Sequence, residues 1–288
     1  MAEVVSSPGV RRERVTRFRV GEQVESAERD DLIAVEDPLE IRIDGAPWSI
    51  TMRTPGDDLD LVAGFLVGEG VITHARHLAA LGHVGDAVLG NTVDARLAAG
   101  ATPPADAAAR HSVMTSACGI CGTESIDAIQ KRARWSLDDD ETVVAAGVLA
   151  ALPDRLREAQ TLFDSTGGVH AAGLFTAAGD VLCVREDVGR HNAVDKVVGW
   201  ALREGMLPLR GTVLQVSGRA SFELVQKARL AGIPMLAAVG APSSLSRDLA
   251  ESSGLTLVGF SRGGGFCVYT HPRRVVAGAS RAVGRHAE

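Results

Sequence analysis

The chain has 288 residues, which suits one or two domains with a sizeable core, and its formal net charge is −6 at pH 7. The acidic balance argues against general nucleic-acid binding, and no stretch approaches the roughly 20 apolar residues of a membrane span. Four cysteines do not suggest a disulfide scaffold, and residues 1–9 lack the apolar run of a signal peptide, so we expect a protein of the reducing cytoplasm.

Basic residues gather near both ends of the chain. They are Arg11, Arg12, Arg14, Arg17 and Arg19, and then Arg273, Arg274, Arg281 and Arg285. Charge runs of this kind are usually solvated, so we expect both ends to be exposed and partly disordered.

The first third of the sequence has the pattern of a small α+β unit. Residues 39–43 and 48–52 alternate apolar with polar side chains around Asp44-Gly45, which predicts a β-hairpin. Thr54-Pro55-Gly56-Asp57 is typical of a helix start, and apolar residues from 59 to 67 follow at helical spacing. Residues 98–110 are rich in alanine and proline and predict a loop.

Strands and helices alternate in the second half. We expect a helical region over 143–161 that is broken at Pro153, and a hairpin of strands 171–176 and 181–185. Further strands are predicted at 212–216, 233–239, 255–260 and 266–269, and helices at 192–204, 221–230 and 244–251. Apolar strands alternating with helices indicate βα units around a mostly buried sheet.

These patterns divide the chain into three segments. Residues 1–111 form an N-terminal α+β region with a disordered start, and residues 112–271 hold a cysteine loop and an α/β domain. Residues 272–288 form a basic tail. The expected fold class is therefore α/β, with a smaller N-terminal α+β domain.

Three successive strands end in small and basic residues. Val216 is followed by Ser217-Gly218-Arg219, Val239 by Gly240-Ala241-Pro242, and Phe260 by Ser261-Arg262-Gly263-Gly264-Gly265. Ligands of open α/β sheets gather beyond the carboxyl ends of the strands, and glycine loops with arginine forks suit phosphate. A nucleotide-like ligand fits this set, although any one such loop is also ordinary turn chemistry.

Asp187, Arg190 and His191 follow the second strand of the expected hairpin and leave two interpretations open. They can contribute to the same ligand site, or they can form a salt-bridged helix cap. His170, at a strand start, is either an acid/base or ligand group or a hydrogen-bonded structural histidine.

Cys118 and Cys121 lie in the cysteine loop, Ala117-Cys118-Gly119-Ile120-Cys121-Gly122, just before a helical stretch that starts near Thr123. The positive end of a helix favours the thiolate, and flanking glycines give it freedom to move. Cys183 and Cys267 have apolar neighbours instead, and this pattern predicts that both are buried in strands.

Several chemistries could use this pair of thiols. A zinc site needs two more ligands, and no second C-x-x-C supplies them. Zinc deaminase chemistry needs an earlier H-x-E, which is missing, while a thioredoxin-like dithiol is expected on a rigid helix rather than between glycines. A mobile loop suits the carriage of a sulfur atom as a persulfide.

The separated motifs of this chain together resemble the formate dehydrogenase accessory sulfurtransferases, the FdhD/NarQ family, from about residue 37 to residue 269. The resemblance rests on Cys118-Gly-Ile-Cys121-Gly122, Thr166-Gly-Gly-Val-His170, Arg185-Glu-Asp-Val-Gly189-Arg-His-Asn192-Ala-Val-Asp-Lys196, Ser217-Gly-Arg219 and Gly240-Ala-Pro-Ser-Ser244.

The resemblance implies a cytoplasmic sulfurtransferase that carries sulfur from an L-cysteine desulfurase to the molybdenum cofactor of formate dehydrogenase. It implies a cytidine deaminase-like three-layer α/β/α fold, a homodimer, and no metal of its own. The family's persulfide cysteine maps to Cys118, and Cys121 matches the second cysteine. The implied ligand is the bis(molybdopterin guanine dinucleotide) cofactor.

The family's cofactor-binding stretch falls on Phe260, Ser261, Arg262, Gly263, Gly264 and Gly265, where this chain has glycines in place of the bulkier or polar residues usual at the last three positions. From the strand-end argument we add Ser217, Arg219, Arg190 and His191 as binding residues. A non-catalytic chaperone for the molybdenum cofactor is the alternative function, and a zinc-stabilised binding module is the third.

Overall fold

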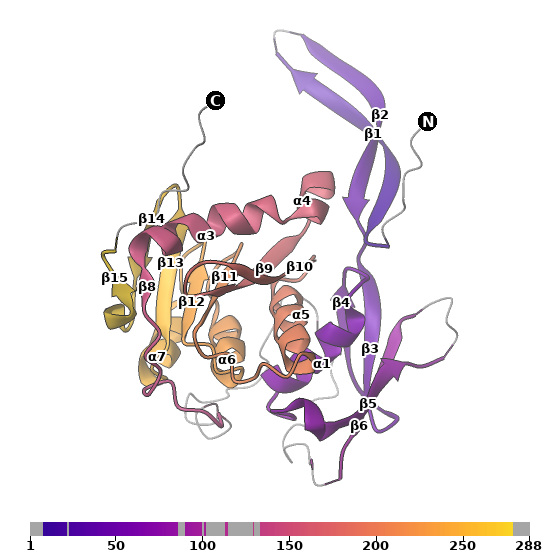
Figure 1. Ribbon diagram of the computed structural model, residues 1–288. Coiled ribbons are helices and arrows are strands. Elements are labelled where there is room, and N and C mark those ends of the chain that lie inside the picture. Colours follow the sequence, from indigo (N-terminus) through magenta and orange to yellow (C-terminus); the bar gives the residue numbers. More distant parts are fainter. Residues whose placement is uncertain are drawn as a thin grey trace, which may run out of the picture.

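The computed structural model describes residues 8–21, 23–85, 90–99, 101, 113–114, 129 and 133–278. Two β-sheets with helices packed on them form the body of the molecule, and a long β-hairpin projects from it (Figure 1). Within this part of the chain, no helix combines the length and the apolar character needed to cross a membrane.

The larger sheet has six strands in the order β10-β9-β11-β12-β13-β14. They are β9 (His170–Thr176), β10 (Val181–Asp187), β11 (Thr212–Val216), β12 (Met235–Ala238), β13 (Thr256–Arg262) and β14 (Gly265–Val268). The neighbours β11, β12 and β13 are parallel, so their carboxyl ends lie at one edge of the sheet. The predicted strands are thus confirmed, and the α/β fold class with them.

Helices cover both faces of this sheet (Figure 1). Along β11, Val213 faces α3 (Ala146–Glu158) while Leu214 faces the opposite core, because side chains alternate along a strand. The opposite face carries α5 (Arg190–Arg203), α6 (Phe222–Leu230) and α7 (Ser244–Ser252). The short α4 (Thr161–Thr166) follows α3. The specific cytidine deaminase-like relationship remains a prediction.

Helix α3 runs through Pro153 without a break, contrary to the sequence-based expectation. Proline removes one backbone donor and normally ends or kinks a helix. Here Leu149, Leu152 and Leu156 are buried against the sheet on both sides of the proline, and this packing keeps the helix continuous.

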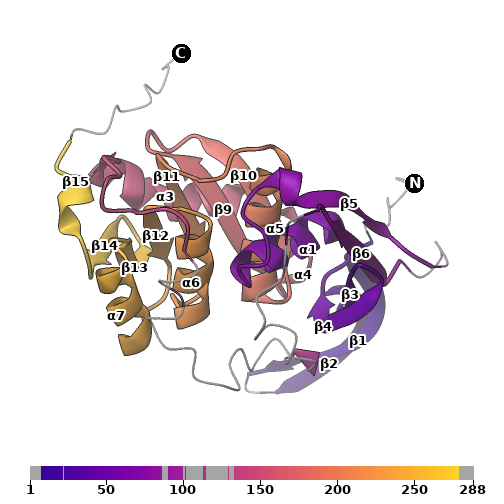
Figure 2. The same cartoon turned by 90° about the horizontal axis from the view of Figure 1, so that it is seen from below.

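The smaller sheet lies beside α1 and α5, with strands in the order β5-β6-β3-β4-β7 (Figure 2). Its strands are β3 (Asp37–Ile43), β4 (Ala46–Arg53), β5 (Leu78–His83), β6 (Thr92–Leu97) and β7 (Val113–Met114). The predicted β3–β4 hairpin and the helix after it, α1 (Asp58–Gly68), are confirmed. Strands β5 and β6 and the short 3-10 helix Ala75–His77 were not predicted from the sequence.

Two glycines allow α1 and α5 to pack closely. A Cβ atom on Gly64 would lie 1.8 Å from the backbone oxygen of Asp195, and one on Gly199 would lie 1.8 Å from that of Asp60. No side chain fits in that space. The helix of the N-terminal region is therefore in direct backbone contact with the α/β unit.

The basic N-terminal stretch is a strand rather than a disordered end. Strands β1 (Val10–Val20) and β2 (Val24–Ala34) pair in antiparallel register over their whole length. Arginines of β1 lie across from acids of β2; for example, Arg14 contacts both Glu28 and Asp30. The backbone pairing thus makes a hairpin whose faces carry charge pairs instead of an apolar face, which is why the strand pattern was missed.

The basic C-terminal segment is only partly solvated, which corrects the expectation for one residue. Arg274, next to β15 (Val275–Val276), is 1 % exposed and donates to the backbone oxygens of Gly254 and Leu137. β15 pairs with β8 (Val144–Ala145), so this end is attached to the body. The predicted domain boundary at 111/112 and the tail beyond residue 278 lie outside the described residues.

Candidate functional site

The cysteine loop lies outside the residues that the structure describes, so Cys118 and Cys121 stay sequence-based predictions. Of the helix expected after it, the structure describes Ile129 alone, which is helical and fully buried. The site can therefore be built only from the sheet edge that the sequence singled out.

The loops after β11, β12 and β13 lie side by side. The Gly240 N–H donates to the oxygen of Gly218 over 2.9 Å, and the Phe260 N–H donates to the oxygen of Gly240 over 3.1 Å. Backbone hydrogen bonds thus join the loops after β11 and β12 to each other and to the end of β13, in the order of the strands. This is the geometry in which open α/β sheets bind ligands.

A cleft of about 580 Å³ opens at this edge, and we call it the carboxyl-edge cleft. From the sheet side, its walls include His170, Ser217, Arg262 and Gly263, all singled out from the sequence. The opposite wall is formed by the end of α3 and by α4. Its polar and aromatic members are Arg157, Gln160 and Phe163. No sequence pattern beyond a helical one pointed to these three residues.

Ser217 and His170 give the cleft neutral hydrogen-bonding groups. Ser217 Oγ accepts the Ala171 N–H over 2.9 Å, which leaves its own proton free to donate to a ligand. Burial lowers the pKa of His170, and the nearby positive charge of Arg190 lowers it further. His170 is thus an uncharged imidazole at neutral pH.

The other arginines proposed from the sequence lie close by but do not line the cleft. Arg190 lies beside Gly218 and His170, and its buried Nε has no hydrogen-bond partner in the described part of the chain. Arg219 is exposed, with its stem against the backbone of Gly240. A guanidinium with an unpaired buried N–H is suited to an anion, because such groups are costly to leave unpaired.

His191 is occupied elsewhere. Its Nε2 lies 3.4 Å from Ser221 Oγ and 3.7 Å from Glu223 Oε2. The contact with His191 lowers the pKa of Glu223 to about 2, while burial lowers the pKa of His191. The side chain of His191 therefore holds the start of α6 and does not line the cleft.

The stretch from Phe260 to Gly265 is a strand end and a tight turn, rather than a loop that starts at Ser261. β13 continues to Arg262, which pairs with Gly265 across the turn. Gly263 and Gly264 have φ values of +59° and +76°, as a two-residue hairpin turn requires. The turn explains two of the three glycines, whereas Ser261, 0 % exposed, keeps a hydroxyl with no described partner.

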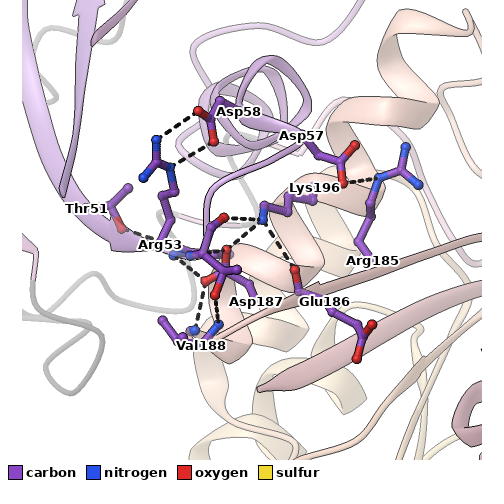
Figure 3. Close-up of polar contacts among 12 residues, drawn as sticks. Thr51, Arg53, Asp57, Asp58, Arg185, Glu186, Asp187, Val188 and Lys196 are labelled. Carbon is purple, nitrogen blue, oxygen red and sulfur yellow. Dashed lines mark hydrogen bonds and ion pairs between the residues drawn. The ribbon is translucent and has the colours of Figure 1, made fainter. Parts of the chain in front are cut away.

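The motif from Arg185 to Lys196 forms a buried polar network between the two sheets (Figure 3). Lys196 Nζ lies 2.8 Å from Asp187 Oδ2, and the two side chains are 2 % and 0 % exposed. Asp187 also accepts the backbone N–H groups of Thr54 and of Gly189, the residue before α5, although no side chain caps the first turn of that helix. For Asp187 the structure therefore favours the structural, salt-bridged interpretation over a ligand role, but the bridge is not a side-chain cap of α5.

Further hydrogen bonds connect this network to the β4–α1 segment. Asn192 Nδ2 donates to the Met52 oxygen over 2.7 Å, and Lys196 donates to the Thr54 oxygen over 2.9 Å. Arg53 forms a two-pronged ion pair with Asp58 at 2.9 and 3.0 Å. The motif thus joins the N-terminal sheet to the α/β unit and fixes the position of α5, at whose start Arg190 lies.

The remaining cysteines differ from each other. Cys183 is buried in β10, as predicted, and burial raises the pKa of its thiol to about 12. It is therefore unreactive near neutral pH. Cys267 is exposed, contrary to the prediction, because β14 is the edge strand of its sheet.

Comparisons with known proteins give consistent results. The sequence profile of the FdhD/NarQ family matches residues 34–276. The chain is 53 % identical over 279 residues to the sulfur carrier protein FdhD of Streptomyces avermitilis, covering 95 % of this chain and 98 % of the relative. The protein of the same name from Mycobacterium tuberculosis is 51 % identical over 255 residues, covering 86 % and 92 %, respectively. That of Sulfurisphaera tokodaii is 41 % identical over 266 residues, covering 91 % and 98 %.

The fold is also similar to a solved structure. The crystal structure of a proposed formate dehydrogenase accessory protein from Desulfotalea psychrophila matches with a TM-score of 0.73 and 25 % sequence identity. The match covers 93 % of this chain and 100 % of that one. The hairpin of β1 and β2 lies almost entirely before the residues matched by the family profile.

Proposed function

Because the chain belongs to the FdhD/NarQ family, we propose that it is a sulfur carrier protein required for formate dehydrogenase activity. The observation that carries the proposal is the motif Cys118-Gly-Ile-Cys121-Gly122, in a chain 53 % identical to a protein named as a sulfur carrier. The thiols of Cys183 and Cys267 have no comparable setting, since one is buried and the other lies on an edge strand.

Sulfur enters by thiolate exchange. The Cys118 thiolate attacks the outer sulfur of a persulfide on an L-cysteine desulfurase, and the thiolate of the desulfurase leaves. Cys118 then carries the sulfur as its own persulfide. The exchange transfers a sulfane sulfur and needs no outside electrons, because one persulfide replaces another.

Release is the step in which Cys121 acts. Its thiolate attacks the inner sulfur of the Cys118 persulfide, which forms a Cys118–Cys121 disulfide and frees hydrosulfide. The dithiol supplies the two electrons that turn sulfane sulfur into sulfide. The acceptor is the molybdenum of the bis(molybdopterin guanine dinucleotide) cofactor of formate dehydrogenase, and a cellular thiol reductant restores the dithiol.

The carboxyl-edge cleft holds the phosphates of that substrate in this proposal. Arg262 and the hydroxyl of Ser217 line the cleft, and the exposed backbone of Gly263 permits close approach. Arg190, with its unpaired Nε beside Gly218, contributes a further positive charge. This donor set suits a diphosphate, since guanidinium groups bind phosphate oxygens in pairs.

Activation of sulfur-free formate dehydrogenase by purified variants tests the proposal. Cys118→Ala should abolish activation and Cys121→Ala should reduce it, whereas Cys267→Ser should leave it unchanged. A Cys118→Ala protein that still activates the enzyme fully would overturn the persulfide assignment. Dispensable cysteines with intact cofactor binding would favour the cofactor chaperone instead.

A further inference from the structure

The wall of the carboxyl-edge cleft formed by α3 and α4 contains a buried glutamine with no structural partner. Gln160 is 4 % exposed and lines the cleft, and its side-chain amide makes no hydrogen bond within the described part of the chain. Its amide atoms are not among the completely enclosed polar atoms of the described residues, so the small exposed part of Gln160 includes the amide, which meets water in the cleft. The structure therefore leaves this amide available to a ligand.

Gln160 occupies a helix-capping position, but its amide does not cap the helix. It is the residue before α4, where side chains commonly cap the helix, yet Gln160 makes no capping bond. Glu186 of β10 performs this role instead, accepting the N–H groups of Leu162 and Phe163 at 2.8 Å each. Because another strand supplies the cap, the Gln160 side chain is not needed to hold the helix.

The surroundings of Gln160 in the cleft suit a flat ring. Phe163 and the apolar Leu156 and Val169 line the same cleft. The guanidinium of Arg157 lies 4.8 Å from the centre of the Phe163 ring and pairs with Asp164, so two planar groups lie together beside Gln160. Apolar and planar walls with one convergent polar group are typical of sites that bind heterocycles.

We propose that this α3–α4 corner, residues 156–163, binds the base of the guanine dinucleotide, with the Gln160 amide bonded to the base edge. The inference rests on the proposed function, which supplies the ligand class. An amide presents one acceptor beside two donors, and the edge of guanine presents a carbonyl oxygen beside ring and amino N–H groups. The phosphates then lie toward Arg262 and Ser217 on the opposite wall.

Calorimetric titration with two probes separates recognition of the base from recognition of the phosphates. Guanosine diphosphate contains both parts, and inorganic pyrophosphate contains only the phosphates. Gln160→Leu should weaken guanosine diphosphate binding at least tenfold and leave pyrophosphate binding within twofold. Because the amide makes no hydrogen bond within the described residues, the variant should keep the unfolding temperature of the unaltered protein. Gln23→Leu, on the exposed hairpin, is the matched control and should change neither affinity.

The outcomes distinguish the two proposals. If the unaltered protein binds guanosine diphosphate and Gln160→Leu binds it equally well, the α3–α4 corner does not bind the base, while the phosphate site stands. If the two probes bind the unaltered protein with equal affinity, the base makes no contribution and the inference again fails. If neither probe binds, the carboxyl-edge cleft is not the cofactor site, and both the proposed site and this inference are wrong.

Discussion

Replacement of Lys196 tests whether the Arg185–Lys196 motif is a structural junction or part of a ligand site. The Lys196→Met variant keeps a long apolar stem but removes the ammonium that lies 2.8 Å from Asp187. Asp187 then remains as a carboxylate with no exposed surface and no countercharge. We expect the variant to bind ligands in the cleft if it folds, and to be much less stable.

The size of the loss follows from what remains around the carboxylate. Removing one partner of a buried ion pair costs about 3–5 kcal/mol. Asp187 keeps three N–H donors, from Thr54, Gly189 and Asn192, which places Lys196→Met near the lower limit, about 3 kcal/mol. That is a large share of the 5–15 kcal/mol typical of a folded domain.

Urea unfolding followed by circular dichroism measures this loss directly. Asp187→Asn alone should cost a similar amount, and the double variant should be more stable than the sum of the two losses by about 1–3 kcal/mol, because both charges are then gone. Arg247→Met removes an exposed ion pair with Glu251 and should cost less than about 1 kcal/mol. A loss below 1 kcal/mol for Lys196→Met, or strictly additive losses, would refute a junction held by a buried ion pair.

Three further predictions concern packing, pH and the ligand. Gly199→Ala should destabilise the protein by at least about 2 kcal/mol or prevent folding, because the new Cβ would lie 1.8 Å from the backbone oxygen of Asp60. Gly82→Ala is the control, since its Cβ would meet nothing within 4 Å, and it should be tolerated in the same unfolding assay. Burial lowers the pKa of His170, so as the pH falls below 6.5 the unfolded chain takes up the proton first and the protein loses stability. His170→Gln should therefore lose less stability than the unaltered protein between pH 7.5 and pH 5.5, and an equal loss would contradict this. Arg262→Ala should weaken guanosine diphosphate binding about tenfold or more, since charge-assisted hydrogen bonds contribute about 1.5–3 kcal/mol each, whereas Arg247→Ala should leave the affinity measured by calorimetry unchanged.

The sequence predicted the elements whose apolar residues follow one clear period. The β3–β4 hairpin shows period two around its Asp44-Gly45 turn, and β11 to β13 are short apolar strands separated by helices with one buried face. Burial on a fixed face is what produces these periods, so both sheets could be located in part from the residues alone.

Elements held by other forces escaped prediction. The β1–β2 hairpin pairs through its backbone along its whole length, and its exposed faces carry cross-strand ion pairs between distant residues, such as Arg14 with Glu28, in place of an apolar period. Arg274 is buried because distant carbonyl groups accept its N–H bonds, and no local pattern encodes such partners. Pro153 stays helical through packing of the leucines on either side.

The candidate site was predicted on one wall and missed on the other. Parallel strands bring their carboxyl ends together, so Ser217 and Arg262 could be grouped before any fold was known. Gln160 and Phe163 belong to a helix junction whose place over the cleft depends on long-range packing. His191 could not be assigned because its partner, Glu223, lies one helix further along the chain.

Mass spectrometry of the intact protein after incubation with an L-cysteine desulfurase and cysteine addresses the sulfur carrier assignment most directly. A mass increase of one sulfur atom, located by peptide mapping on Cys118 and lost in Cys118→Ala but kept in Cys267→Ser, is the predicted result. Sulfur that remains in Cys118→Ala, or that maps to Cys183 or Cys267, would contradict it.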